Sequence, residues 1–311
     1  MRIVRGLASY PPDARPSAVA LGTFDGVHLA HRAILGTAVS RARAADLTAL
    51  ACTFDPHPTE VLAPERAPLP ITTLDERLAL IAETGIDATV VIAFTREVAD
   101  IEPEAFVKEA LVERLRAREV VVGFNHRFGR AARGDTALLR DLGGRLGFVV
   151  HVIEPLTADG VPVSSTEVRA ALQRGDLEQA ARFLGRPYSI AGTVTPGAGR
   201  GRTLGFPTAN VAPERPVLVP PGVYGCRAEV GGRVIRAVVN IGVRPTFGET
   251  NLAVEAHLLD FSGDLYGQSI RLLLMARLRD ERKFPSVDAL REQIGRDIAL
   301  ARERLGDGRF T

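Results

Sequence analysis

Two histidines three residues apart follow an apolar stretch near the start of the chain. In GTFDGVHLAH, residues 22–31, a glycine-containing turn precedes His28 and His31. If a helix begins at His28, His31 lies one turn further along the same face. Such a helix start offers unpaired N–H groups and a positive dipole, which favour an anionic phosphate, and two imidazoles add hydrogen-bond donors. The spacing alone is equally compatible with ordinary surface histidines.

Composition and cysteine usage exclude several other classes. A formal net charge of +2, with basic and acidic residues interleaved, gives no electrostatic argument for nucleic acid or an anionic membrane. Zinc is disfavoured because there is no HExxH motif and no cysteine near the histidine pair. The two cysteines, Cys52 and Cys226, lie far apart without a CxxC motif, which indicates a reducing compartment.

The same sequence predicts a cytoplasmic protein. The first residues lack the apolar region of a signal peptide, and no run approaches the roughly 18 apolar residues of a membrane span. An oligomer is compatible with the sequence, but no pattern in it indicates an oligomeric state.

Short β-rich runs alternate with helical stretches over about residues 18–160. We expect strands at 17–24, 47–54, 88–94, 119–124 and 147–155, and helices at 28–45, 74–84, 103–115 and 136–146. Parallel strands need crossover connections, so this alternation predicts a parallel sheet with helices on both faces. Ligands of such sheets bind at the carboxyl ends of the strands. GTFDGVHLAH, TFDPHP (53–58) and GFNHRFG (123–129) all fall there.

The sequence pattern changes after two further predicted helices. Ser164 and Glu167 have capping-box spacing, which predicts a helix ending near Gly175, and a second helix follows at 176–184. We place a domain boundary there, giving domains 1–185 and 186–311. Apolar strands at 188–194, 225–230, 233–242, 253–261 and 269–278 lack intervening helices, which predicts an antiparallel β-barrel followed by a terminal helix at 286–305.

Four segments in order carry a family resemblance over about residues 1–185. GTFDGVHLAH, TFDPHP, VGFNHRFG (122–129) and VSSTEVR (163–169) resemble the adenylyltransferase module of the prokaryotic bifunctional riboflavin kinase/FAD synthetase family, a Rossmann-like nucleotidylyltransferase fold with an HxGH signature. In this chain Ala30 takes the place of the signature glycine, and Asn125-His126 replaces an Asp-aromatic pair.

The resemblance implies an ATP site and a flavin pocket in this domain. The residues implied to bind ATP or its phosphates are Gly22, Phe24, His28, His31, Asn125, Ser165, Thr166 and Arg169, of which His28, His31 and Arg169 would be catalytic. The rigid turn Pro56, His57 and Pro58 would border the flavin, although a plain turn is an equal alternative. Ser164 and Glu167 are also compatible with pure helix capping.

The second domain resembles the riboflavin kinase fold. The resemblance rests on GRTLGFPTAN (201–210), VVNIGVRPTFG (238–248), VEAHLLDFSGDLYG (254–267) and ERKFPS (281–286). It implies that Thr208 and Asn210 bind Mg·ATP as metal ligands, that Glu255 is the general base, and that Arg244 contacts phosphate or flavin. Gly197, Gly199 and Gly201 would shape the nucleotide loop. From the residues alone, PTAN is a capped loop, and a lone strand glutamate such as Glu255 lies on a solvent face.

Together the two domains imply a bifunctional enzyme. Riboflavin and ATP would give FMN, and FMN and ATP would then give FAD and pyrophosphate, with Mg²⁺ as the metal ion. The product of the second domain is the substrate of the first, which explains why one chain carries both. The alternatives are a riboflavin kinase with an impaired adenylyltransferase domain, or a protein that binds and senses flavin.

Overall fold

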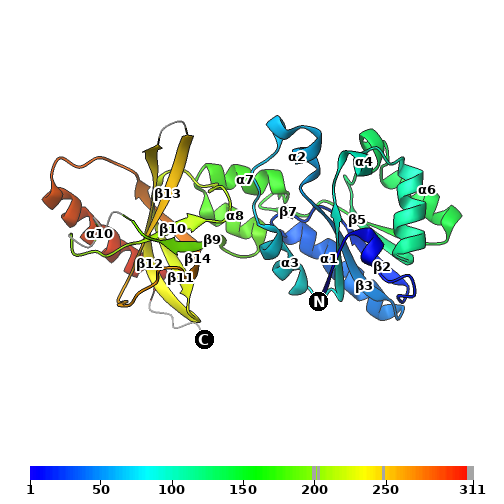
Figure 1. Cartoon of the computed structure of the whole chain (residues 1–311), viewed down its shortest axis with the longest axis horizontal. Helices are drawn as coiled ribbons and strands as arrows, with labels where there is room; N and C mark the ends of the chain where they lie inside the picture. Colours follow the sequence, from blue (N-terminus) through cyan, green and yellow to red (C-terminus); the bar gives the residue numbers. More distant parts are fainter. Residues whose placement is uncertain (198–200, 202–203, 247–248, 307–311) are drawn as a thin grey trace. The chain divides into compact units, whose positions relative to one another are not determined.

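The chain divides into two compact units, Met1–Ser165 and Thr166–Thr311 (Figure 1). The computed structural model describes residues 1–197, 201, 204–246 and 249–306, with the main chain alone at 244–246 and 249–251. The division assigns the two short helices after residue 165 to the second unit. The domain boundary at residue 185 stays a prediction.

The first unit is built on a six-stranded sheet in the order β1-β4-β3-β2-β5-β6, and every neighbouring pair is parallel. The strands are β1 (Arg2–Arg5), β2 (Ser17–Leu21), β3 (Thr48–Asp55), β4 (Ala88–Ala93), β5 (Ala117–Gly123) and β6 (Val149–Ile153). The predicted parallel sheet is confirmed. Strand β1 was not predicted, because it is a four-residue edge strand in which only Val4 is buried.

Helices cover both faces of this sheet. The helices of this unit are α1 (Leu29–Ala44), α2 (Pro58–Leu62), α3 (Leu74–Ala82), α4 (Arg96–Ala99), α5 (Pro103–Ala105) and α6 (Thr136–Leu146), with 3-10 turns η1 (Leu7–Ser9), η2 (Pro64–Arg66) and η4 (Arg130–Ala132). Residues of α1 and α3 pack in one core layer and residues of α6 in the other. The expected helix at 103–115 continues after α5 as a π-helix, η3 (Phe106–Arg114), which ends where Leu115 N–H donates to the Ala110 carbonyl five residues earlier. A ribbon of β7 (Thr157–Ala158) and β8 (Val161–Pro162) follows.

Alternation along the strands sorts the core into two layers. On β2, Ala18 and Ala20 pack with Leu35 of α1, whereas Val19 and Leu21 pack with Phe106 and other side chains of the opposite layer. Successive strand residues point to opposite faces, so each strand contributes to both layers. The small alanines let α1 lie close to the sheet, which fixes the helix whose first turn carries the two histidines.

The second unit begins with α7 (Ser165–Gln173, of which Ser165 belongs to the first unit) and α8 (Leu177–Leu184). Six antiparallel strands then close a barrel in the order β10-β13-β12-β11-β14-β9, and α10 (Val287–Leu305) packs against β11, β12 and β14. The strands are β9 (Tyr188–Thr195), β10 (Ala209–Pro213), β11 (Gly222–Val230), β12 (Arg233–Thr246), β13 (Glu249–Leu258) and β14 (Ser269–Asp280). The predicted barrel is confirmed, with β10 added. Among the helices of the described ranges, none is both long and apolar enough to cross a bilayer.

Both cysteine thiols are buried and free, which gives a direct chemical prediction. Burial raises the pKa of Cys52 to about 12 and raises that of Cys226 as well. At pH 8 a thiol with such a pKa is only about 10⁻⁴ thiolate, the reactive form. We expect no reaction with an aromatic disulfide reagent in the native protein and two reactive thiols per chain in denaturant. Rapid native labelling would contradict the burial.

Candidate functional site

The carboxyl ends of β2 and β5 lie side by side where the strand order reverses. From β2 the chain proceeds to β3 and β4 on one side, whereas β5 and β6 lie on the other. In open parallel sheets this switch point is where ligands bind. GTFDGVH leaves β2 and GFNHRF leaves β5, so the topology brings the first and third predicted segments to one crevice edge.

His28 caps α1, and its ring stacks on His31. The His31 N–H donates to Nδ1 of His28 at 3.3 Å, and the two ring centroids are 3.6 Å apart at 19°. Because Nδ1 accepts, a neutral His28 carries its proton on Nε2, which makes Nε2 a donor. His28 is 4% exposed, so little water competes for this donor. The predicted helix start at His28 is confirmed, and the helix N-terminus adds its own donors.

The turn between β2 and His28 has an unusual backbone. Phe24, Gly26 and Val27 have φ values of 52°, 81° and 38°. For a β-branched residue such as Val27 this is a rare conformation, and strain of this kind costs on the order of 1–3 kcal/mol per residue. The Phe24 ring is fully buried and packs edge-on against His31, and a Cβ on Gly22 would lie 3.1 Å from that ring. Phe24 therefore supports His31 from inside the core.

Asn125 and His126 leave the end of β5 in a tight turn, in which the His126 N–H donates to the Gly123 carbonyl at 3.0 Å. Asn125 is exposed at this edge. The His126 ring stacks on Phe128, and desolvation by burial lowers the pKa of His126 to about 4. His126 is therefore neutral at physiological pH, and its ring packs as an aromatic group against Phe128.

The TFDPHP segment forms a capped turn at the end of β3. Nδ1 of His57 accepts the Thr59 N–H, and Glu60 accepts the His57 N–H, so His57 and Glu60 form a capping box for α2. Pro58 occupies the first turn of that helix, and the Asp55–Pro56 peptide bond is cis. These contacts give His57 a local structural role, and flavin binding by Pro56, His57 and Pro58 stays a prediction.

Ser165, the first residue of α7, is hydrogen-bonded to the turn that precedes His28. The Ser165 hydroxyl donates to the main-chain oxygen of Asp25 at 3.0 Å. Thr166 and Arg169 belong to the second unit. Their roles, and that of Ser165 toward phosphate, stay predictions.

A second group of polar residues forms a row across three barrel strands. The register pairs Asn210 of β10 with Glu255 of β13, and Glu255 with Asn240 of β12. Directly paired residues share one face of a sheet. Val254 and Ala256 are buried on the other face, so this row points outward. Sequence reasoning identified Asn210 and Glu255 but missed Asn240, because only the strand register shows that it is their neighbour.

The glycines before this row leave room for Asn210 and Thr208. A Cβ on Gly197 would lie 1.9 Å from Asn210 Nδ2, and one on Gly201 would lie 2.9 Å from the Thr208 hydroxyl. A side chain at Gly197 would therefore displace Asn210, and one at Gly201 would also lie 2.4 Å from the main-chain oxygen of Phe206. Gly199 lies outside the described residues, and nothing is described of the Arg244 side chain.

Two further side chains border the row. The His257 ring nitrogen Nδ1 donates to the Pro207 carbonyl at 2.8 Å, and Phe206 packs edge-on against the same ring. A Cβ on Gly242 would lie 2.3 Å from Oε1 of Glu281, which places that carboxylate beside Asn240. The sequence could have predicted His257, because it lies two residues after Glu255 in the same strand and therefore on the same face. Glu281 belongs to the ERKFPS segment, and only the folded structure shows that it lies near the row.

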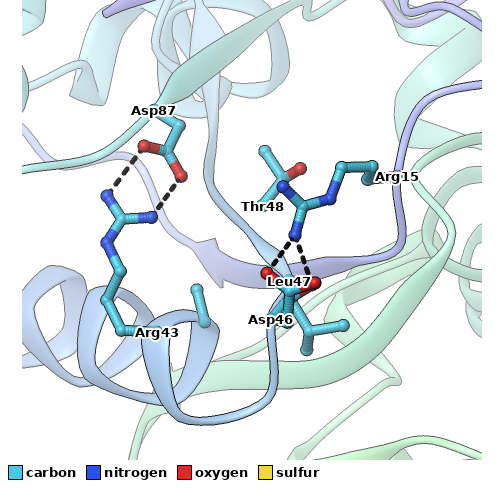
Figure 2. Close-up of a pocket in the computed structure, with 7 residues that line it drawn as sticks. Arg15, Arg43, Asp46, Leu47, Thr48 and Asp87 are labelled. Atoms are coloured by element: carbon cyan, nitrogen blue, oxygen red, sulfur yellow. Dashed lines mark hydrogen bonds and ion pairs between the residues drawn. The ribbon is translucent and has the colours of Figure 1, made fainter.

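A polar pocket of about 340 Å³ lies at the opposite, amino edge of the parallel sheet, where Thr48 begins β3 and Asp87 precedes β4. Figure 2 shows Arg43 paired with Asp87, and Arg15 with Asp46. Each guanidinium already has a carboxylate partner: Arg15 and Asp46 join the loops before β2 and β3, and Arg43 joins α1 to the loop before β4. This pocket is not the predicted nucleotide site.

The comparisons match both units. A family model described as FAD synthetase matches residues 10–167, and one described as riboflavin kinase matches residues 184–305. Relatives named bifunctional riboflavin kinase/FMN adenylyltransferase are 38% identical in Escherichia coli (strain K12), with 98% of each chain covered, and 40% identical in Bacillus subtilis (strain 168), with 90% of each covered. A crystal structure from Streptococcus pneumoniae, described as a macrolide-efflux protein, is 27% identical with a TM-score of 0.89, covering 97% of this chain and 99% of that one. The chain belongs to the family of bifunctional riboflavin kinase/FMN adenylyltransferases.

Proposed function

We propose that this chain performs both reactions of its family, with riboflavin phosphorylation at the barrel and adenylyl transfer at the parallel sheet. Family membership over nearly the whole chain supports the pair of reactions. The residue roles are supported by two constellations on the described residues: the stacked His28–His31 pair at the switch point, and the Asn210–Glu255–Asn240 row.

In adenylyl transfer, an oxygen of the FMN phosphate attacks the α-phosphorus of ATP, and the bond to the β-phosphate oxygen breaks to release pyrophosphate. No covalent intermediate with the protein is needed, so catalysis depends on positioning and charge stabilisation. His28 Nε2–H and the His31 imidazole, at a helix N-terminus, would donate to phosphate oxygens as charge builds. Gly22, Phe24, Asn125, Ser165, Thr166 and Arg169 are the other residues assigned to ATP.

In the kinase reaction, the ribityl 5′-hydroxyl of riboflavin attacks the γ-phosphorus of ATP and ADP leaves. Glu255 would accept the hydroxyl proton as general base. Its half-buried position between two asparagines suits this role, because the amides can orient the carboxylate without neutralising it. Gly197, Gly199, Gly201 and Arg244 would complete the nucleotide and flavin contacts.

The donor set at the barrel fits Mg²⁺. Thr208 and Asn210 offer the hydroxyl and amide oxygens that this ion accepts, and Gly197 and Gly201 leave space beside them. Within the described ranges no three His, Cys, Asp or Glu side chains gather as a dense metal site would require. Substrate phosphates would therefore supply much of the coordination. Thr208 and Asn210 would hold the ion, which would supply positive charge to stabilise the transferring phosphate.

The observation that carries the proposal is the match of both family models to one chain. The test is to incubate the purified protein with riboflavin and Mg·ATP and separate the flavins by chromatography. FAD accumulation is the expected result. FMN alone would identify a kinase with an impaired first unit, the alternative to which Ala30 draws attention. Flavin binding without either product would indicate a sensing protein. We place both reactions in the cytoplasm, which the free, buried cysteines support.

The glycine beside Asn210 gives a prediction for the kinase alone. Gly197→Ala places a methyl group 1.9 Å from Asn210 Nδ2, so Asn210 must move. We expect the KM for ATP in FMN formation to rise at least about tenfold, a change of about 1.4 kcal/mol, while FAD formation from added FMN is unchanged. Gly295→Ala in α10, where a Cβ meets nothing within 4 Å, is the matched control. Unchanged kinase kinetics in Gly197→Ala would remove this loop from the nucleotide site.

A further inference from the structure

Asp25 is a buried carboxylate in the middle of the left-handed turn that precedes His28. It is 5% exposed, and its oxygens accept the N–H groups of Ile71 at 3.0 and 3.1 Å and of Thr72 at 3.1 Å. The Thr72 hydroxyl donates to Asp25 at 3.1 Å and accepts the Gly26 N–H at the same distance. A carboxylate is buried at little net cost only when donors surround it in this way.

Arg77, five residues after Thr72, also contacts the turn that precedes His28. Its guanidinium is buried, and Nη1 donates to the Thr23 carbonyl at 2.7 Å and to the Phe54 carbonyl at 3.1 Å. Nη2 donates to Asp55 at 3.4 Å. Arg77 thus connects the turn after β2 to the turn after β3, the two strand ends that carry the histidine pair and the TFDPHP segment.

The turn needs such support because its backbone is unfavourable. Phe24 and Val27 are held at positive φ on either side of Asp25, and a Cβ on Gly26 would meet Ile71 at 3.0 Å. Strained backbone of this kind persists only where the surroundings over-determine it, and it clusters at functional sites. His28 follows Val27 directly, so any relaxation of the turn redirects the His28 ring.

We propose that Asp25, Thr72 and Arg77 are positioning residues for adenylyl transfer, which hold the strained turn so that His28 and His31 meet the ATP phosphates. This inference rests on the proposed function of the first unit. The hydrogen bonds described above for the three side chains all join them to other parts of the protein, so we assign them an action through the histidines and not on the substrate.

The test uses Thr72→Val, which removes the hydroxyl but keeps the shape, and Thr72→Ser, which restores it. We expect kcat for FAD formation to fall at least tenfold in Thr72→Val and in Asp25→Asn, and to recover to within threefold in Thr72→Ser. Riboflavin phosphorylation by the same samples stays within twofold of wild type and controls for the amount of intact chain, whereas Thr72→Ser and the control variant below control for the folding of the first unit. Asp87→Asn is the matched control: its carboxylate also accepts a main-chain N–H, from Ala49 at 2.8 Å, but at the amino edge of the sheet (Figure 2).

A merely structural role predicts different results. The proposal is overturned if Thr72→Val retains wild-type kcat, if Asp87→Asn loses adenylyl transfer equally, or if kinase and adenylyl activities fall together. A second readout does not depend on activity. The ¹⁵N shifts of the His28 ring report which nitrogen carries the proton. We expect an Nε2–H form in wild type and a mixture in Thr72→Val. If wild type forms no FAD, the proposed function fails, and an unchanged His28 ring in Thr72→Val would separately overturn the positioning role.

Discussion

Replacing His28 with alanine lowers FAD formation from FMN and ATP by about 10²–10³-fold, the effect of losing one donor that stabilises transition-state charge. The variant loses the Nε2 donor, the stacked partner of His31 and the N-cap of α1. Riboflavin phosphorylation continues at the wild-type rate, because the site that we propose for it, the Asn210–Glu255–Asn240 row, lies on the barrel. Both rates are measured on one sample by chromatographic separation of the flavins.

The role of His28 as the N-cap of α1 can be separated from its proposed role as a catalytic donor. An N-cap replaced by alanine costs about 1 kcal/mol, whereas asparagine is itself a good N-cap. His28→Asn therefore restores stability but not the imidazole, and we expect it to remain as inactive in adenylyl transfer as His28→Ala. Thr95→Ala removes the cap of α4, after β4 and two strands from β2, and keeps both activities. Wild-type FAD formation by His28→Asn would show that His28 acts only as a cap.

The sequence predicts the elements better than it predicts their arrangement. The helix over residues 136–146 and the helix start at His28 match the structure, because caps and periodicity are local properties. Strands β1 and β10 were missed because each has four or five residues, and their stability comes from pairing with β4 and with β9 and β13. Such pairing leaves no local pattern.

The candidate site residues also divide into those that a local sequence pattern reveals and those that only long-range contacts reveal. His28, His31 and Glu255 are visible as unusual residue types at strand ends or within apolar strands. Asn240 becomes part of the barrel row only through the β12–β13 register. The hydrogen bond that supports the turn before His28 joins Asp25 to Thr72, 47 residues away, and no sequence periodicity connects those positions. Long-range contacts of this kind are properties of the folded state alone.

Glu255→Gln removes the proposed base while keeping a side chain of nearly the same shape between Asn210 and Asn240. We expect riboflavin phosphorylation to fall by about 10²–10⁴-fold, the usual contribution of a positioned general base. We expect FAD formation from added FMN to remain at the wild-type rate, since the adenylyl-transfer site that we propose on the parallel sheet does not include Glu255. The measurement is FMN production from riboflavin and Mg·ATP, with adenylyl transfer from added FMN as the second assay.

A control substitution at a second barrel glutamate distinguishes a catalytic effect of Glu255→Gln from a loss of barrel stability. Glu229 of β11 is a half-exposed barrel carboxylate that pairs with Arg271 at 3.5 Å, away from the polar row, so Glu229→Gln keeps both activities. Mixing the Glu255→Gln and His28→Ala proteins provides a complementary test, because each supplies the reaction that the other lacks. Riboflavin is then converted to FAD by the mixture and by neither protein alone. If the mixture also fails, the two reactions do not belong to the two separate sites, and the assignment of Glu255 and His28 to different units is wrong.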